Sequence, residues 1–235
     1  MPDPSQPVHL RPVAALAHRV LLPGDPGRAL ALAQVVLGDD RKMFNHHRGL
    51  WGYTGTAADG ALLTVQSTGM GGPSAAVVLE ELAALGVRSA VRVGTARALD
   101  GGPEAGALLA VTHALAADGT SRALGAAQRS PLDENLTAAL TPAAARAGVV
   151  VSSDVLYDDD APAASERRTS WLAAGAVATD LETAALAAVA ARRAVRFAAL
   201  LTIAAGPQGD RCDDEALEHA GAAAGRAAAA ALAAG

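Results

Sequence analysis

The stretch "GGPSAAVVLEELAALGVRSAVRVGT", residues 71–95, decides the fold. Its first part predicts a helix over 71–86, because Pro73 presets a helical φ near the start and Gly86 provides a stop. The run "VRSAVRVG" at 87–94 is short and mostly apolar, which predicts a buried strand. A helix followed directly by a buried strand is the repeating unit of an α/β domain.

The same alternation continues on both sides of this stretch. The other predicted elements are a strand, sharp turn and helix over 19–38, a hairpin over 50–69, a strand at 106–119, a helix capped by Ser130 over 130–148, a strand at 149–154, an exposed segment with a short helix at 157–170, a strand and helix over 175–194, a strand at 195–206 and a helix from Glu215 onward. This order predicts an α/β fold with a largely parallel sheet.

Length and composition narrow the class of protein. The 235 residues fit one domain, 1–235, and 51% hydrophobic residues with only 3% aromatic predict a core of Ala, Val and Leu. The net charge of −5 argues against nucleic acid as a partner. The single cysteine, Cys212, excludes an internal disulfide and favours a reducing, cytoplasmic location. Neither a signal peptide nor a membrane span is expected, since Arg226 interrupts the alanine-rich tail.

Ligands of such sheets bind beyond the carboxyl ends of the strands, so residues that follow strands are candidates. In "PGDPGR", residues 23–28, Gly24 allows close approach of backbone N–H groups, and the helix start with Arg28 favours an anion. The alternative is an ordinary strand-to-helix turn with a solvated arginine.

Arg92 ends an apolar strand, where an unpaired arginine should not be buried. It either meets a carboxylate or points into a site beyond the strand, where Thr95 would help to form an oxyanion site. Arg97 follows the Gly-Thr pair and is expected in a loop.

Two further segments carry candidate side chains. In "TDLETA", 179–184, the carboxylates of Asp180 and Glu182 could bind sugar hydroxyls or stabilise a cation, or they could simply favour a helix start. In "FNHHRGLWGYTG", 44–55, adjacent histidines without carboxylate or cysteine at ligand spacing do not indicate a metal site. Arg48 in that segment is a third possible anion ligand.

Taken in order, these segments resemble the trimeric-to-hexameric nucleoside phosphorylases, the family of bacterial purine nucleoside phosphorylase and uridine phosphorylase. The resemblance runs from "VHLRP" to "LETAALAA", and its strings are "VLLPGDPGRA", "HRGLWGYTGT", "STGMGGPSAAVVLEELAALGVRSAVRVGT", "DGTS", "SSDVLY" and "DLETAAL". It implies a single-domain, three-layer α/β fold with a mixed central sheet flanked by helices. It also implies a homohexamer, built as a trimer of dimers with shared active sites.

The resemblance assigns roles to the matching positions. Catalysis would fall to Arg92 and Glu182, and phosphate would be held by Gly24, Arg28, Arg92, Thr95 and the Arg48 of a neighbouring subunit. Ribose would be held by Met70, Leu181, Glu182 and the neighbour's His9. The base would contact Thr95, Ala96, Leu156, Tyr157 and Asp180.

The implied reaction is phosphorolysis of purine (deoxy)ribonucleosides to free base and (deoxy)ribose 1-phosphate. Phosphate attacks the anomeric carbon through an oxocarbenium-like state, which bound phosphate and Glu182 stabilise. The substrates would be a nucleoside and inorganic phosphate as co-substrate, with no metal or other cofactor.

The chain departs from the family pattern around the base. Arg97 stands where the family has glycine, and its side chain could enter the base pocket or turn to solvent. The acid that purine enzymes carry after the late strand falls, within "LTIAAGPQGD" (201–210), on Gly206, Gln208 or Asp210, and its identity stays open. Leu156 replaces the usual aromatic base-stacker.

Three functions therefore compete. The purine enzyme is favoured because "RGLWGYTG" is more purine-like, and because Asp160 and Pro162 stand where uridine phosphorylases carry uracil-reading Gln and Arg. The alternatives are a uridine or other pyrimidine nucleoside phosphorylase, and a degenerate, non-catalytic binder of nucleoside or phosphate.

Overall fold

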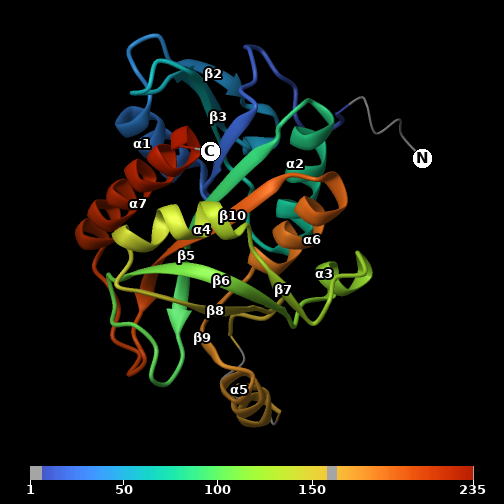
Figure 1. Cartoon of the computed structure of the whole chain (residues 1–235), viewed down its shortest axis with the longest axis vertical. Helices are drawn as coiled ribbons and strands as arrows, with labels where there is room; N and C mark the ends of the chain where they lie inside the picture. The colour runs from blue at the N-terminus through green and yellow to red at the C-terminus, as the bar shows by residue number, and fades with distance from the viewer. Residues whose placement is uncertain (1–6, 158–162, 235) are drawn as a thin grey trace.

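The computed structural model describes residues 7–157 and 163–234 of the chain (Figure 1). Its strands are β1 (Arg19–Leu22), β2 (Lys42–Asn45), β3 (Gly52–Thr56), β4 (Leu62–Gln66), β5 (Ser89–Ala98), β6 (Leu108–Ala116), β7 (Arg129–Pro131), β8 (Arg146–Ser152), β9 (Ala176–Asp180) and β10 (Arg196–Ala205). Its helices are α1 (Pro26–Val36), α2 (Gly72–Ala84), α3 (Gly119–Ala123), α4 (Glu134–Leu140), α5 (Ala164–Ala173), α6 (Thr183–Arg193) and α7 (Asp214–Ala234), with 3-10 turns η1 (His47–Gly49) and η2 (Thr141–Ala143).

All described strands belong to one sheet, in the order β10-β6-β8-β9-β5-β1-β4-β3-β2, with β7 beside β6. Because β10 also pairs with β5, the first five strands of this order close into a ring, and β1, β4, β3 and β2 extend from it as a wing. β5 is shared by the ring and the wing, so its side chains lie where the two parts meet.

The sheet is mixed, which confirms the expectation from the family and corrects the expectation of a largely parallel sheet. Parallel pairs are β1–β4, β1–β5, β5–β10, β6–β8 and β8–β9. Antiparallel pairs are β2–β3, β3–β4, β5–β9, β6–β7 and β6–β10. Short hairpin connections and the reversed direction of β9 account for the difference, and neither has a signal in the helix–strand alternation.

Helices cover both faces of the sheet, giving three layers (Figure 1). α1, α4 and α7 cover one face over a core that includes Leu32, Val91 and Val93, while α2 and α6 cover the other over a core that includes Leu79 and Leu186. Small residues permit this close packing. A Cβ at Gly225 of α7 would lie 2.4 Å from the side chain of Leu32 in α1.

Most predicted elements are confirmed, including the hairpin β3–β4, helices α2 and α7, and the strands β6 and β10. β5 continues through Ala98, so Arg97 lies in a strand and not in a loop. α4 is capped by Asp133, which accepts a hydrogen bond from Leu136 N, whereas Ser130 lies in β7. β8 begins at Arg146, where a helix was expected.

Within the described residues, no helix combines the length and apolar character needed to cross a membrane. Residues 158–162, which belong to the segment 157–170 expected to be exposed and include Asp160 and Pro162, lie outside the described residues.

Candidate active site

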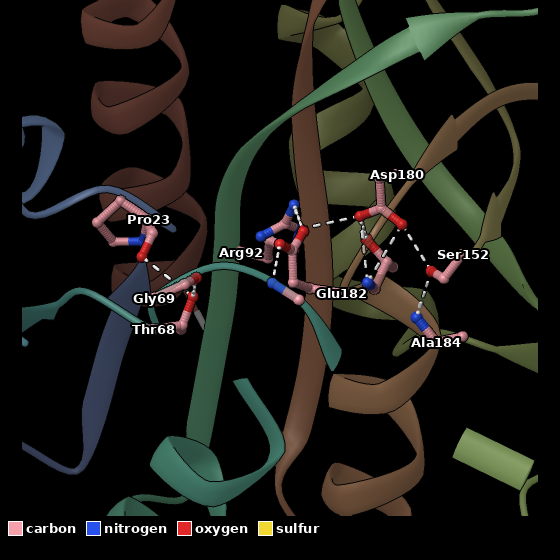
Figure 2. Close-up of polar contacts among 10 residues, drawn as sticks. Pro23, Thr68, Gly69, Arg92, Ser152, Asp180, Glu182 and Ala184 are labelled. Carbon is pink, nitrogen blue, oxygen red and sulfur yellow. Dashed lines mark hydrogen bonds and ion pairs between the residues drawn. The ribbon is translucent and has the colours of Figure 1, made fainter. Parts of the chain in front are cut away.

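Arg92 of β5 is the centre of a buried charge cluster (Figure 2). Only 2% of its surface is exposed, its Nε donates to Asp180 Oδ2 at 3.1 Å, and its Nη2 donates to Glu182 Oε2 at 2.6 Å. The third nitrogen, Nη1, is buried and has no hydrogen-bond partner among the described residues. Of the two alternatives that the sequence left open, Arg92 therefore meets carboxylates, and one of its buried donors lacks a hydrogen-bond partner among the described residues.

The direction of β9 explains how these carboxylates reach Arg92. β9 runs antiparallel to β5, with Thr179 opposite Arg97 and Ala178 opposite Ala98. The chain that leaves β9 therefore runs back along β5 toward Arg92, and Asp180 and Glu182 meet its guanidinium just before α6 begins.

Asp180 anchors the cluster. Its side chain is fully buried, with Oδ1 accepting from Ser152 Oγ at 2.6 Å and Oδ2 accepting from Thr183 N at 3.1 Å as well as from Arg92. Thr183 Oγ1 donates to the same oxygen. Ser152 Oγ in turn accepts from Ala184 N at 2.9 Å. The carboxylate has no open lone pair for a base, so its geometry is that of a residue that positions Arg92 and the start of α6.

Glu182 joins the cluster to the glycine-rich turn before α2. Its Oε1 accepts from Gly71 N at 2.7 Å, and the residue is buried. Gly69 and Gly71 have φ of 72° and 87°, a region that favours glycine. Between them, Met70 is 80% exposed. The hydrogen bond from Gly71 N therefore joins the turn that carries Met70 to Glu182.

The "PGDPGR" turn adds a second cation. Asp25 caps α1 by accepting from Arg28 N at 2.7 Å, and Gly24 lies against Gly69 O. Burial lowers the pKa of Arg28, the nearby Asp25 carboxylate opposes this change, and the positive charge of Arg92 lowers the pKa further. Within the described residues, the Arg28 guanidinium makes no ion pair. Two guanidiniums close enough to repel each other, with donors to spare, are suited to an anion.

Arg48 and His9 lie away from this cluster, on a surface segment of their own. Arg48 is exposed and has φ 58°, in the left-handed region, and it makes no described contact with Arg92. His9 Nδ1 lies 2.8 Å from Glu81 Oε1, and His47 Nδ1 lies 2.9 Å from His9 O, which ties the two parts of the segment together. A single chain does not bring these two residues to the candidate site.

The residues predicted to contact the base differ in burial and in the face of the sheet from which they project. Cross-strand pairing with β10 places Arg92 opposite Ala199 and Thr95 opposite Thr202, so the Thr95 and Arg92 side chains leave β5 on opposite faces. Ala96 is buried in the core. Leu156 is exposed, and Tyr157 is 91% exposed.

A separate pocket lies on the Arg97 side of the cluster. Its lining includes Arg97, Leu156, Arg168, Trp171, Thr179 and Leu181. The last of these directly precedes Glu182. Sequence reasoning had assigned Leu156 and Leu181 to base and ribose, but it missed Arg168 and Trp171 of α5, and also Ser152. Only the "SSDVLY" string pointed to Ser152, and nothing in the sequence indicated that α5 would cover this pocket.

His46 and His47 are part of no metal-ligand group among the residues that the structure describes. In the part of the chain that the structure describes, no three or more His, Cys, Asp or Glu side chains are grouped so as to hold a metal ion.

Comparisons with known proteins identify what this chain resembles. The family model of the phosphorylase superfamily matches residues 18–234. A uridine phosphorylase of Treponema pallidum (strain Nichols) is 33% identical over 202 residues, covering 80% of this chain and 77% of that protein. A DeoD-type purine nucleoside phosphorylase of Clostridium beijerinckii is 34% identical over 207 residues, covering 83% and 84%. The crystal structure of uridine phosphorylase from Vibrio fischeri ES114 has a TM-score of 0.83 and 25% identity, covering 94% and 93%.

Proposed function

Because this chain belongs to the nucleoside phosphorylase family, we propose that it cleaves purine (deoxy)ribonucleosides with inorganic phosphate. The products are the free base and (deoxy)ribose 1-phosphate. The observation that carries this proposal is the buried Nη1 of Arg92, which lacks a partner among the described residues while Glu182 holds the adjacent nitrogen. An oxyanion at that position would satisfy the orphan donor.

Phosphate would lie between Arg92 and Arg28, with backbone N–H groups of the Gly24 turn at its edge. Arg48 of a second copy would add a third guanidinium. We retain Thr95 as a phosphate and base contact through its backbone N–H, since its side chain leaves β5 on the other face.

Ribose would lie over Glu182 and Met70, with Leu181 beside it and His9 of a second copy closing the site. As phosphate attacks, a bond forms between a phosphate oxygen and the anomeric carbon while the bond to the base nitrogen breaks. The electron pair of the broken bond goes to the base, and positive charge builds on the sugar. Glu182 and the bound phosphate face that charge and lower its energy.

Two observations bear on which base the enzyme accepts. The sequence "RGLWGYTG" favours purines, whereas the 33% identity to a uridine phosphorylase supports uridine as the second candidate substrate. Leu156, Tyr157 and Ala96 remain proposed neighbours of the base, and Asp180 is proposed to act through Arg92 instead of touching the base.

We also propose a cytoplasmic homohexamer, assembled as a trimer of dimers, that uses phosphate as co-substrate and needs no other cofactor. The location of Arg48 and His9 on a surface away from Arg92 supports sharing of sites between copies.

The test is base release from inosine, guanosine, adenosine and uridine, each with and without phosphate. Release that requires phosphate, and that is lost in Arg28→Ala but kept in the surface variant Arg41→Ala, supports the proposal. Release without phosphate would indicate a nucleosidase. Binding without turnover of any substrate would indicate a non-catalytic binder.

A further inference from the structure

We propose that the hydroxyl of Ser74 positions Glu182 for the sugar, by holding the glycine-rich turn at 68–71 in the shape that binds the Glu182 carboxylate. This inference rests on the proposed function, which assigns Glu182 to the sugar. Ser74 acts through the turn and contacts no substrate, so its role is that of a positioning residue.

The Ser74 hydroxyl closes the turn from the start of α2. Ser74 is the third residue of that helix, it is half-buried, and its Oγ donates to Thr68 O at 2.6 Å. Serines inside helices commonly bond a carbonyl three or four residues earlier, whereas Thr68 lies six residues earlier and outside the helix. The cap position of α2 is Gly71, which supplies no side-chain cap. The hydroxyl therefore ties the helix to the turn and does not cap the helix.

The turn leaves room for this hydroxyl at Gly69. The φ of Gly69 is 72°, in the region that favours glycine, and a Cβ at this position would lie 2.5 Å from Ser74 Oγ. Backbone conformation and space thus both require glycine at position 69. The Ser74 hydroxyl lies against the space that the missing side chain leaves.

The two ends of the turn are bonded to the two halves of the candidate site (Figure 2). At one end, Thr68 N donates to Pro23 O at 2.8 Å, next to the Gly24 loop. At the other end, Gly71 N donates to Glu182 Oε1 at 2.7 Å. β1 and β4 are parallel neighbours, so the segments that follow them leave the sheet at the same edge. The turn therefore links the proposed phosphate loop to the proposed sugar carboxylate.

The Ser74 bond fixes one end of this link against the other. It holds Thr68 O to α2, the helix that begins directly after Gly71. Glu182 is oriented by one donor on each oxygen, Gly71 N on Oε1 and Arg92 Nη2 on Oε2. If the turn relaxes, the first donor moves and the carboxylate follows Arg92. A carboxylate that stabilises a developing positive charge acts only when it is held in place before the reaction.

The test compares Ser74→Ala and Ser74→Thr with the wild-type enzyme. We expect Ser74→Ala to lower kcat/KM for inosine about 10- to 100-fold at saturating phosphate, because displacement of Glu182 weakens its interaction with the charged sugar. Ser74→Thr keeps the hydroxyl and should recover most of this loss. KM for phosphate should stay within about threefold of wild type, because Thr68 keeps its bond to Pro23 O.

Thr112→Val is the matched control. It also removes a half-buried hydroxyl that donates to a backbone oxygen, Gly148 O at 3.2 Å, but in β6. It should lower the free energy of unfolding without lowering kcat/KM. A loss of activity in Thr112→Val as large as in Ser74→Ala would show that any lost hydroxyl of this kind has the same effect, and would overturn the role of Ser74.

A double-mutant cycle with Glu182→Ala tests whether Ser74 acts through that carboxylate. In the Glu182→Ala background, Ser74→Ala should change kcat/KM less than about twofold, because the group that it positions is already gone. Equal fold-losses with and without Glu182 would overturn the inference.

The same cycle measured by calorimetric binding of inosine does not need turnover. A binding loss in Ser74→Ala that disappears in Glu182→Ala, in a chain without phosphorolysis, would sustain the role of Ser74 and defeat the proposed function. Equal binding losses in both backgrounds would defeat the inference even if phosphorolysis occurs.

Hydrogen–deuterium exchange gives a readout that needs no substrate. Exchange in a peptide spanning 69–73 should be faster in Ser74→Ala than in wild type, because the Gly71 N–H is held less firmly to Glu182, and it should be unchanged in Thr112→Val. Wild-type exchange in Ser74→Ala would overturn the inference.

Discussion

The guanidinium of Arg92 lies directly over Gly94, two residues further along the same face of β5. A Cβ at position 94 would be 2.6 Å from Arg92 Cζ and 2.7 Å from Nη2. The absence of a side chain at Gly94 of the "RVGT" string therefore leaves the space that the Arg92 guanidinium occupies.

Gly94→Ala should push Arg92 away from Asp180 and Glu182. We expect a loss of about 1–3 kcal/mol in the free energy of unfolding, from overpacking of a buried position. We also expect kcat/KM to fall at least about 100-fold, because Arg92 Nη1 loses its position. Urea titration and phosphorolysis assays measure the two effects. Gly221→Ala, in open space on α7, is the control and should be neutral or slightly stabilising. Full activity in Gly94→Ala would refute this role.

Ser152 supports the same arginine from a distance. Its hydroxyl donates to Asp180 Oδ1 at 2.6 Å and accepts from Ala184 N at 2.9 Å. Ser152→Ala leaves a buried carboxylate oxygen and a buried N–H each with one partner fewer, which should cost about 1–3 kcal/mol of stability. Because we propose that Asp180 positions Arg92 for phosphate, KM for phosphate should rise more than kcat falls. Ser170→Ala, at an exposed position, is the control. An unchanged KM for phosphate in Ser152→Ala would contradict the proposal that Ser152 positions Arg92 through Asp180.

Parts of this architecture were predictable from the sequence because their signals are local. Pro73 and Gly86 bracket α2, and the alanine-rich tail forms α7, as their propensities indicate. The extension of β5 through Arg97 was not predictable, because it depends on pairing with β9 and β10, whose residues are about 80 to 110 positions away.

The site shows the same division. Arg92, Glu182 and Arg28 were found from their position after strands, together with the family resemblance. The full set of hydrogen bonds to the Asp180 carboxylate could not be predicted, because it depends on Ser152 of β8 lying beside Asp180 of β9. The cap of α4 also depends on tertiary pairing. Asp133 accepts from a free N–H group at the start of α4, whereas Ser130 lies in β7 because it pairs with Ala114 of β6.

Glu182→Gln separates charge from shape. The amide oxygen can still accept from Gly71 N, but the amide nitrogen then faces Arg92 Nη2, and the buried guanidinium loses one of its two carboxylates. We therefore expect the free energy of unfolding to fall as well, which urea titration would measure. The substitution also removes the negative charge that we propose to face the sugar, and we expect kcat to fall about 100- to 1,000-fold. Steady-state kinetics with inosine give the value, and Glu218→Gln on the exposed side of α7 is the matched control. A kcat within threefold of wild type would remove Glu182 from the mechanism.

Asp59 tests the electrostatics of the wing. Hydrogen bonding from Arg19, at 2.6 Å, lowers the pKa of Asp59 from 3.8 to about 2. A depressed pKa means stability that is present above the unfolded value near 3.8 and is lost as the pH falls toward 2. Asp59→Asn should therefore be less stable than wild type at pH 6, by less than about 1 kcal/mol because the pair is partly exposed. The two proteins should converge near pH 2, as urea titrations at stepped pH would record. A difference in the free energy of unfolding between the two proteins that stays constant down to pH 2 would show that the charge of Asp59 contributes nothing to stability.

Arg48 provides a test of shared sites that needs no structure of the assembly. If each site combines Arg28 of one copy with Arg48 of another, the homomers of Arg28→Ala and of Arg48→Ala should both be impaired, the second despite an intact Arg92 cluster. In a mixed dimer, one site receives both substitutions and the other receives neither. Unfolding the two variants together and refolding them should then restore about a quarter of wild-type activity, because random pairing makes half the dimers mixed and each has one intact site. Arg41→Ala mixed with Arg28→Ala is the refolding control and should keep about half of wild-type activity, because half of its sites contain Arg28 and all contain Arg48. Activity of the first mixture equal to the mean of its two homomers would show that Arg48 serves its own chain or none.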